Sequence, residues 1–163
     1  MSAGVSLRKQ VLAAVRACED KSAQAISILE MEKNSGAFTD YFVLASGANP
    51  RQIQAIADSV EEKLRSDGLR PTHSEGYQQA EWVLLDYVDF VVHVFSERAR
   101  RFYDLERLWR SARRLSATDL ARVTRKRAGS RKSSSRATKA AKRKAARPGG
   151  AKSPARRRRK SKP

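Results

Sequence analysis

Apolar side chains recur at helical spacing in two stretches of the first half of the chain. The first stripe consists of Leu7, Val11, Val15 and Cys18, and the second of Ile53, Ile56, Ala57, Val60 and Leu64. The first stripe predicts an amphipathic helix that ends near Asp20. The second helix has a clear start, because Asn49 suits the N-cap, Pro50 the first helical position and Gln52 the third position of a capping box. Gly68 predicts its end.

Short apolar, β-branched runs separated by turn residues predict strands. Residues 25–30 and 39–45 flank a turn at residues 34–36, and we expect them to pair as a hairpin. The segment from Trp82 to Phe95 is apolar on both sides of the turn at residues 86–89, which predicts a second hairpin in the middle of the sheet. Residues 69–74 suit a further short strand.

A helix is expected directly after the second hairpin. Ser96 suits its N-cap, and the apolar positions that follow at helical spacing are Phe102, Leu105, Leu108 and Trp109. The element order mixes hairpins with a helical crossover, which is typical of an α/β (α+β mixed) fold with a mixed β-sheet flanked by helices.

Charge divides the chain into two parts. Residues 1–121 hold 16 of the 35 Lys and Arg and all 17 Asp and Glu, so residues 122–163 carry 19 basic residues and no acidic one. The basic segment also lacks aromatic residues, so it cannot bury enough apolar surface to offset the entropy of an ordered chain. We therefore predict one folded domain over residues 1–115 and a disordered Lys/Arg/Ala-rich tail over residues 122–163.

The composition argues against several classes of protein. A single cysteine, Cys18, excludes internal disulfides and falls on the apolar stripe of the first helix, where we expect it to be buried. No run of 18 apolar residues and no signal-peptide pattern is present, which predicts a cytoplasmic protein. The only histidines, His73 and His93, cannot form a tetrahedral zinc site with one cysteine, and we expect neither metal nor cofactor.

Two arrangements leave an enzymatic alternative open. Asp86 and Asp89 are suited to Mg²⁺ or to acid–base chemistry, although aspartates at a turn more often bond to nearby backbone. Ser46 and Gly47 precede a helix and are suited to a phosphate, but no Gly-rich phosphate-binding motif surrounds them. Together they define the alternative of a Mg-dependent, nucleotidyltransferase-like enzyme.

Binding surfaces are the other candidates. Trp82 begins a strand at a margin of the sheet, and with Arg101 and Tyr103 it suits an exposed patch, because Trp, Tyr and Arg dominate binding hot spots. The tail is suited to nucleic acid, since its cations neutralise phosphates. Its densest run consists of Arg156, Arg157, Arg158, Arg159 and Lys160. A further alternative is that the protein is a non-specific nucleic-acid binder that acts through the tail alone.

Several motifs in fixed order resemble one family, the ribosomal silencing factors, also called the Iojap family. They are Thr39-Asp-Tyr-Phe-Val43, Ser46-Gly47, Arg51-Gln52, Ala55-Ile56-Ala57, Glu75-Gly76, Trp82-x-Leu-x-Asp-Tyr-x-Asp89, Val91-Val-His-Val-Phe95 and Arg101-x-Tyr-x-Leu-Glu-x-Leu-Trp109. The resemblance covers roughly residues 7–109. It implies a domain related in fold to nucleotidyltransferases but without their catalysis.

The resemblance also implies a function and a partner. The protein would bind the large ribosomal subunit through ribosomal protein L-fourteen, block joining of the small subunit and so repress translation. We expect Trp82 and Val83 to be apolar anchors and Arg101 and Tyr103 to be rim contacts. Asp86 and Asp89 would face basic groups of the ribosomal protein.

Two features depart from the family pattern. The family usually carries glycine at the position of Val88, and a β-branched residue resists a positive φ, so we expect a turn of another type there. The tail is not part of the pattern, and from its charge we expect it to bind ribosomal RNA. Whether the protein forms a homodimer stays open.

Overall fold

The computed structural model describes residues 6–122. Its elements are α1 (Leu7–Asp20), β1 (Gln24–Glu30), β2 (Tyr41–Gly47), α2 (Pro50–Ser66), β3 (His73–Glu75), β4 (Trp82–Asp86), β5 (Phe90–Ser96), α3 (Glu97–Tyr103), α4 (Leu105–Leu108) and β6 (Arg113–Leu115). A last helical segment covers residues 117–122. The predicted disorder of the tail concerns residues that, apart from 122, lie outside the described part of the chain.

The strands form one six-stranded mixed sheet in the order β3-β4-β5-β2-β1-β6. β1 and β2 pair antiparallel, β4 and β5 pair antiparallel, and the central pair β2 and β5 is parallel. The predicted mixed sheet and both predicted hairpins are therefore confirmed. The chain between β2 and β5 includes α2, which is the predicted helical crossover.

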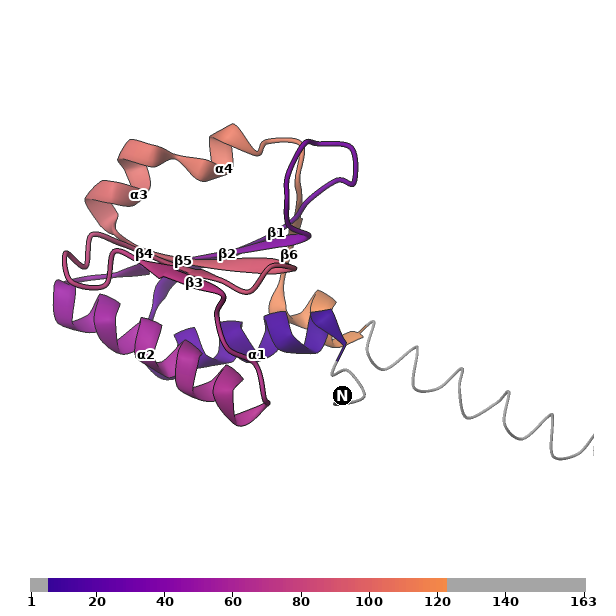
Figure 1. Cartoon of the computed structure of the whole chain (residues 1–163). Coiled ribbons are helices and arrows are strands. Elements are labelled where there is room, and N and C mark those ends of the chain that lie inside the picture. The colour runs from indigo at the N-terminus through magenta and orange to yellow at the C-terminus, as the bar shows by residue number, and fades with distance from the viewer. Residues whose placement is uncertain (1–5, 123–163) are drawn as a thin grey trace, which may run out of the picture. The chain divides into compact units, whose positions relative to one another are not determined.

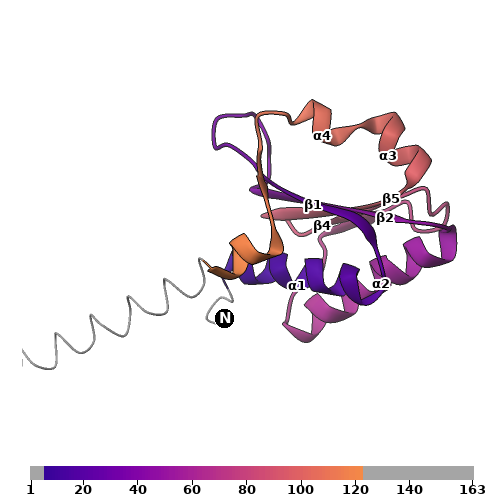
Figure 2. The ribbon, with the colours of Figure 1, turned by 180° about the vertical axis from the view of Figure 1, so that it is seen from behind.

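Two layers of helices cover the two faces of the sheet, with α1 and α2 on one face and α3 and α4 on the other (Figures 1 and 2). Because side chains alternate along a strand, each strand contributes to both layers. Val83 and Leu85 of β4 and Val92 of β5 pack with α1 and α2. Phe95 packs with Ala99 on the other face, under α3.

Both predicted helices of the first half begin and end close to the expected residues. Asn49 Oδ1 accepts a hydrogen bond from the Gln52 amide at 2.9 Å, and Gln52 Oε1 accepts one from the Ala48 amide at 2.6 Å. These bonds satisfy amides that the first turn of a helix otherwise leaves without partners. Cys18 of α1 is fully buried as predicted, and burial raises its thiol pKa to about 12.

The helix predicted after β5 is interrupted. Ser96 Oγ caps it by accepting a hydrogen bond from the Ala99 amide at 3.1 Å, as expected. Asp104, however, adopts a left-handed φ of 42°, which ends α3 and begins the single turn α4. The prediction of one continuous helix is therefore wrong, because apolar spacing alone does not report a left-handed residue between two turns.

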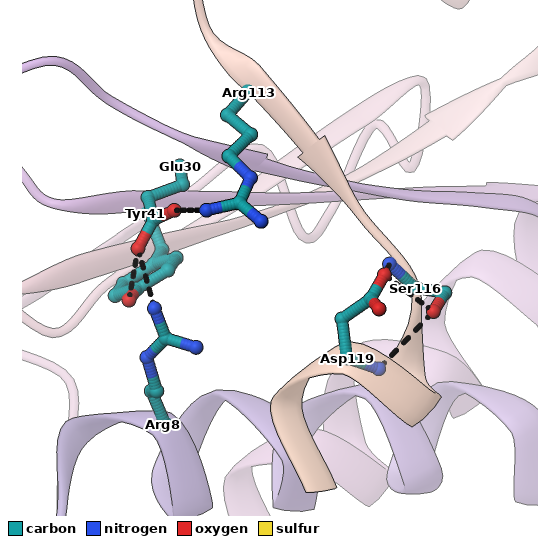
Figure 3. Close-up of polar contacts among 6 residues, drawn as sticks. All are labelled: Arg8, Glu30, Tyr41, Arg113, Ser116 and Asp119. Atoms are coloured by element: carbon teal, nitrogen blue, oxygen red, sulfur yellow. Dashed lines mark hydrogen bonds and ion pairs between the residues drawn. The ribbon is translucent and has the colours of Figure 1, made fainter. Parts of the chain in front are cut away.

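β6 was not predicted, and its anchoring explains why it forms. Glu30 Oε1 accepts hydrogen bonds from Arg8 Nη2 at 2.8 Å and from the Tyr41 hydroxyl at 2.9 Å, and Glu30 Oε2 lies 3.8 Å from Arg113 Nη1. Figure 3 shows Glu30 between these three side chains, which come from α1, β2 and β6. One carboxylate thus joins the C-terminal strand to the rest of the domain.

The segment after β6 crosses to the layer of α1 and α2. Asp119 Oδ2 accepts hydrogen bonds from the Ser116 amide at 2.9 Å and from the Ser116 hydroxyl at 2.7 Å, which stabilises the first turn of the segment at residues 117–122 (Figure 3). Leu120 is completely buried in the core that α1 and α2 form on the sheet. The final turn therefore belongs to the folded core.

The turn of the central hairpin is strained. Val88 adopts a φ of 71°, and the Asp89 amide donates a hydrogen bond to the Tyr87 carbonyl oxygen at 2.9 Å. A hydrogen bond between residues i and i+2 around a central residue with a positive φ defines the rare form of the γ-turn. Valine thus adopts a positive φ although its β-branch resists it, and the expected difference in turn type from the family stays a prediction. Among residues 6–122, no helix is long and apolar enough to cross a membrane.

Candidate partner-binding surface

An aromatic cluster extends from the space between the sheet and the layer of α3 and α4 to the surface of the domain. We define it as Phe42, Trp82, His93, Phe95, Phe102, Tyr103 and Trp109, whose rings contact one another in a continuous chain. The Trp82 ring centroid lies 5.2 Å from that of Phe95 and 4.5 Å from that of Tyr103. Phe95 is buried whereas Tyr103 is 48% exposed, so the cluster extends from the core to the surface.

His93 fixes the orientation of Trp82. Its Nδ1 accepts a hydrogen bond from the indole Nε1 of Trp82 at 3.0 Å. Burial lowers the pKa of His93 to about 4, so the ring is neutral at physiological pH and carries its proton on Nε2. That nitrogen is buried and has no hydrogen-bond partner among the described residues. His93 lies on the same face of β5 as Phe95, and its hydrogen bond orients the neighbouring indole ring.

Arg100 braces the helical layer from within. Its guanidinium donates to Ser46 Oγ at 2.9 Å through Nη1 and to Glu106 Oε1 at 2.7 Å through Nη2. Because these partners lie at the end of β2 and in α4, one side chain of α3 joins three elements. Sequence reasoning missed Arg100, since its two partners are 54 and 6 residues away and follow no local pattern.

Three of the residues predicted for partner binding lie at one end of the sheet. Trp82 and Tyr103 are in contact, and Arg101 comes two residues before Tyr103 in α3, where it is exposed and paired with Glu97. Val83 does not join them, because it points to the opposite face and is completely buried in the core under α2. It supports the strand that carries Trp82 and presents no surface of its own.

The two aspartates lie at the other end of the sheet. Asp86 is opposite Val91 in the strand register, whereas Ser46 is opposite Phe95, four residues further along β5. That offset corresponds to roughly 13 Å at the usual rise per residue. Asp86 Oδ1 accepts a hydrogen bond from the Val88 amide at 2.8 Å, so this carboxylate stabilises the turn.

The groups required by the enzymatic alternative are thus kept apart. Ser46 accepts from Arg100, and a Cβ on Gly47 would lie 2.7 Å from Ile53 Cγ1, so this glycine is required for packing against α2. Of the amides around the start of α2, that of Ala48 is already bonded to Gln52 and that of Gln52 to Asn49. No group of three or more potential metal ligands occurs within the part of the chain that the structure describes.

A mixed sheet with an aromatic cluster that reaches the surface is suited to binding another macromolecule. The particular family follows from the sequence, which matches the family described as "Ribosomal silencing factor during starvation" over residues 5–146. The chain belongs to this family of ribosomal silencing factors. Its members are non-enzymatic regulators of translation that bind the large ribosomal subunit, so the enzymatic alternative is excluded.

Relatives and solved structures agree with this assignment. "Ribosomal silencing factor RsfS" of Bacillus subtilis is 41% identical over 99 residues, which are 61% of this chain and 83% of that protein. A crystal structure of a protein from Chromobacterium violaceum matches with a TM-score of 0.62 and 35% identity, covering 64% of this chain and 87% of that one. One from Bacillus halodurans matches with a TM-score of 0.59 and 36% identity, covering 67% and 98%.

Proposed function

We propose that the protein binds ribosomal protein L-fourteen on the large subunit, in the cytoplasm, and thereby sterically prevents the small subunit from joining. The observation that carries this proposal is the contact between Trp82 and Tyr103 at the surface of the aromatic cluster. Large aromatic rings that are held rigidly lose little entropy on binding, and they are the residues that dominate protein interfaces.

The charge of the β4–β5 turn, which lies at the other end of the sheet from Trp82, suits a basic protein partner. Asp89 is exposed and Asp86 half-buried, and the Asp40 amide donates to the Asp89 carbonyl oxygen at 2.9 Å, which brings a third carboxylate to the same turn. Complementary charge accelerates association and selects the partner. Trp82 and Tyr103 would therefore supply the apolar contact, Arg101 a contact at its rim, and the hairpin the electrostatic attraction, while Val83 acts from the core.

Substituting Trp82 tests the anchor. Trp82→Ala removes the indole and its bond to His93, and we expect the affinity for the large subunit to fall at least tenfold, as at a hot spot. The assay is cosedimentation with purified large subunits, with circular dichroism to establish that the variant is folded. Arg51→Ala, an exposed position on α2 across the sheet, is the control and should bind normally. If the folded Trp82→Ala protein binds the large subunit and blocks joining like the original protein, Trp82 is not part of the binding surface.

The function itself is tested on ribosome profiles. Purified large and small subunits are mixed at rising concentrations of the full chain, and the fraction that forms complete ribosomes is measured by sedimentation. We expect this fraction to fall as the large subunit becomes saturated with the protein. Unchanged joining at saturation would overturn steric occlusion, even where the protein remains bound to the large subunit.

The basic tail would add a second, less specific contact. We propose that residues 122–163, including the run from Arg156 to Lys160, bind ribosomal RNA. Each neutralised phosphate adds roughly 0.7 to 0.9 to the slope of the logarithm of affinity against the logarithm of salt concentration. A chain that ends after Ala121 should therefore bind the subunit more weakly and with a shallower salt dependence. Equal affinity and slope would refute a role for the tail.

A further inference from the structure

Charge is distributed unevenly within the folded domain. Residues 6–96 contain nine basic and thirteen acidic residues, whereas residues 97–122 contain eight arginines and four acidic residues. The second group forms α3, α4, β6 and the last helical segment. The domain therefore combines an acidic first part, which includes the β4–β5 hairpin, with a basic last part.

The acidic residues of the basic part are largely engaged. Glu97 pairs with Arg101, Glu106 with Arg100, and Asp119 bonds to Ser116. By contrast, none of Arg98, Arg107, Arg110 and Arg114 makes an ion pair within residues 6–122, and all four are exposed. Each therefore presents its full charge to solvent.

These four arginines share the layer of α3 and α4. Arg98 lies in α3, Arg107 lies in α4, and Arg110 follows the end of α4 by two residues. Arg114 of β6 pairs with Leu29, whose side chain belongs to the core under this layer, whereas the neighbouring Leu115 packs on the opposite face. By the alternation of side chains along a strand, Arg114 points to the α3 and α4 side.

An exposed aromatic ring belongs to the same helical layer as these charges. Phe102 is 80% exposed, and its ring contacts Tyr103 edge to face at a centroid distance of 5.0 Å. Because Phe102 follows Arg98 by four residues in α3, the two side chains project from the same side of the helix. An accessible ring beside unpaired cations is the arrangement that binds single strands, since bases stack on the ring and cations neutralise phosphates.

We propose that Phe102, Arg98, Arg107, Arg110 and Arg114 form a surface for single-stranded RNA. A basic ribosomal protein does not fit this surface, because like charges facing each other across an interface repel. The inference requires neither the contact to L-fourteen nor the tail. Together with the acidic hairpin, this RNA surface would let one small domain contact a basic protein and an unpaired RNA strand at the same time.

The test uses the full chain with Arg156–Lys160 changed to Gln, which reduces the background from the tail. Binding of a fluorescein-labelled 12-nucleotide U-rich RNA, and of an RNA duplex of equal length, is measured by anisotropy. One variant is Phe102→Ala, which should fold because the ring is mostly exposed. The other combines Arg107→Gln, Arg110→Gln and Arg114→Gln. Its control combines Arg51→Gln, Lys63→Gln and Arg70→Gln, which removes equal charge from exposed positions before β3.

We expect Phe102→Ala to weaken binding of the single strand roughly 5- to 100-fold, as for the loss of one base stack, and to leave duplex binding within twofold. The triple arginine variant should lower the salt slope by about 2, as for three lost phosphate contacts, and its control by less than 0.5. If the salt slope fell equally in the triple variant and in its control, the effect would be one of net charge alone, and the proposed RNA surface would be overturned. Unchanged single-strand affinity of Phe102→Ala would overturn it as well. Weaker binding of these variants to isolated L-fourteen, with RNA affinity retained, would assign the surface to protein instead.

Discussion

Replacing Val88 by glycine should stabilise the protein, because the backbone at this position is strained. Val88 has a φ of 71° at the centre of a γ-turn, a conformation that costs a side-chain-bearing residue roughly 1 to 3 kcal/mol. Glycine adopts it freely but loses about 0.4 to 1 kcal/mol through the greater entropy of the unfolded chain. The valine side chain is 57% exposed, so its removal forfeits less than about 1 kcal/mol of burial.

The balance of these contributions is a stabilisation of about 1 kcal/mol. For a domain of this size, that raises the melting temperature by about 4 °C. Thermal unfolding followed by circular dichroism measures the change. Val88→Ala is the control, because alanine keeps the cost of a positive φ while it removes the β-branch, and it should gain less than glycine. If Val88→Gly melts at or below the temperature of the original protein, the turn is not strained and the reasoning fails.

Three further predictions concern the stability of the folded domain. His93 has a pKa of about 4 in the folded state, below its unfolded value of 6.5, so the unfolded state binds a proton first as the pH falls. The free energy of unfolding should therefore drop by up to about 3 kcal/mol between pH 6.5 and 4. In urea titrations at several pH values, His93→Gln should remove this part of the loss. Gly76→Ala should lower the free energy of unfolding by at least about 3 kcal/mol, because the new Cβ would lie 1.9 Å from the Trp82 carbonyl oxygen. Gly36 has a similar positive φ but open space around it, so Gly36→Ala should cost only about 1 kcal/mol. Equal costs of the two variants in chemical unfolding would contradict the clash. Leu120→Ala should lose about 2 to 4 kcal/mol in the same experiment, and a loss below 1 kcal/mol would show that the last turn is not part of the core.

Local signals in the sequence were sufficient for the first two helices and the two hairpins. The capping residues at Asn49 and Gln52 and the alternation in β5 are short-range features, and each has a direct physical meaning. β6 has no such signal, since two of its three residues are arginines and its contacts with β1 and Glu30 come from a distant part of the sequence. The break at Asp104 likewise has no local signal, because the apolar spacing continues across it.

The candidate surface was predictable in composition but not in arrangement. Trp82 and Tyr103 were predicted as one patch, and their rings are in contact. Val83 was predicted as an apolar anchor together with Trp82, yet neighbours in a strand point to opposite faces, and that alternation buries Val83. The contribution of Arg100 depends on two contacts that only the folded chain brings together.

The crossing of the sheet edge by β6 has a practical consequence. From α4 on one face of the sheet, the chain runs through β6 to residues 117–122, which lie in the layer of α1 and α2 beside the start of α1 (Figures 1 and 2). A fluorophore or fusion partner joined after Arg122 would thus start behind the sheet, away from Trp82 and Phe102. Labels at that site should report on the bound protein without obstructing either docking surface.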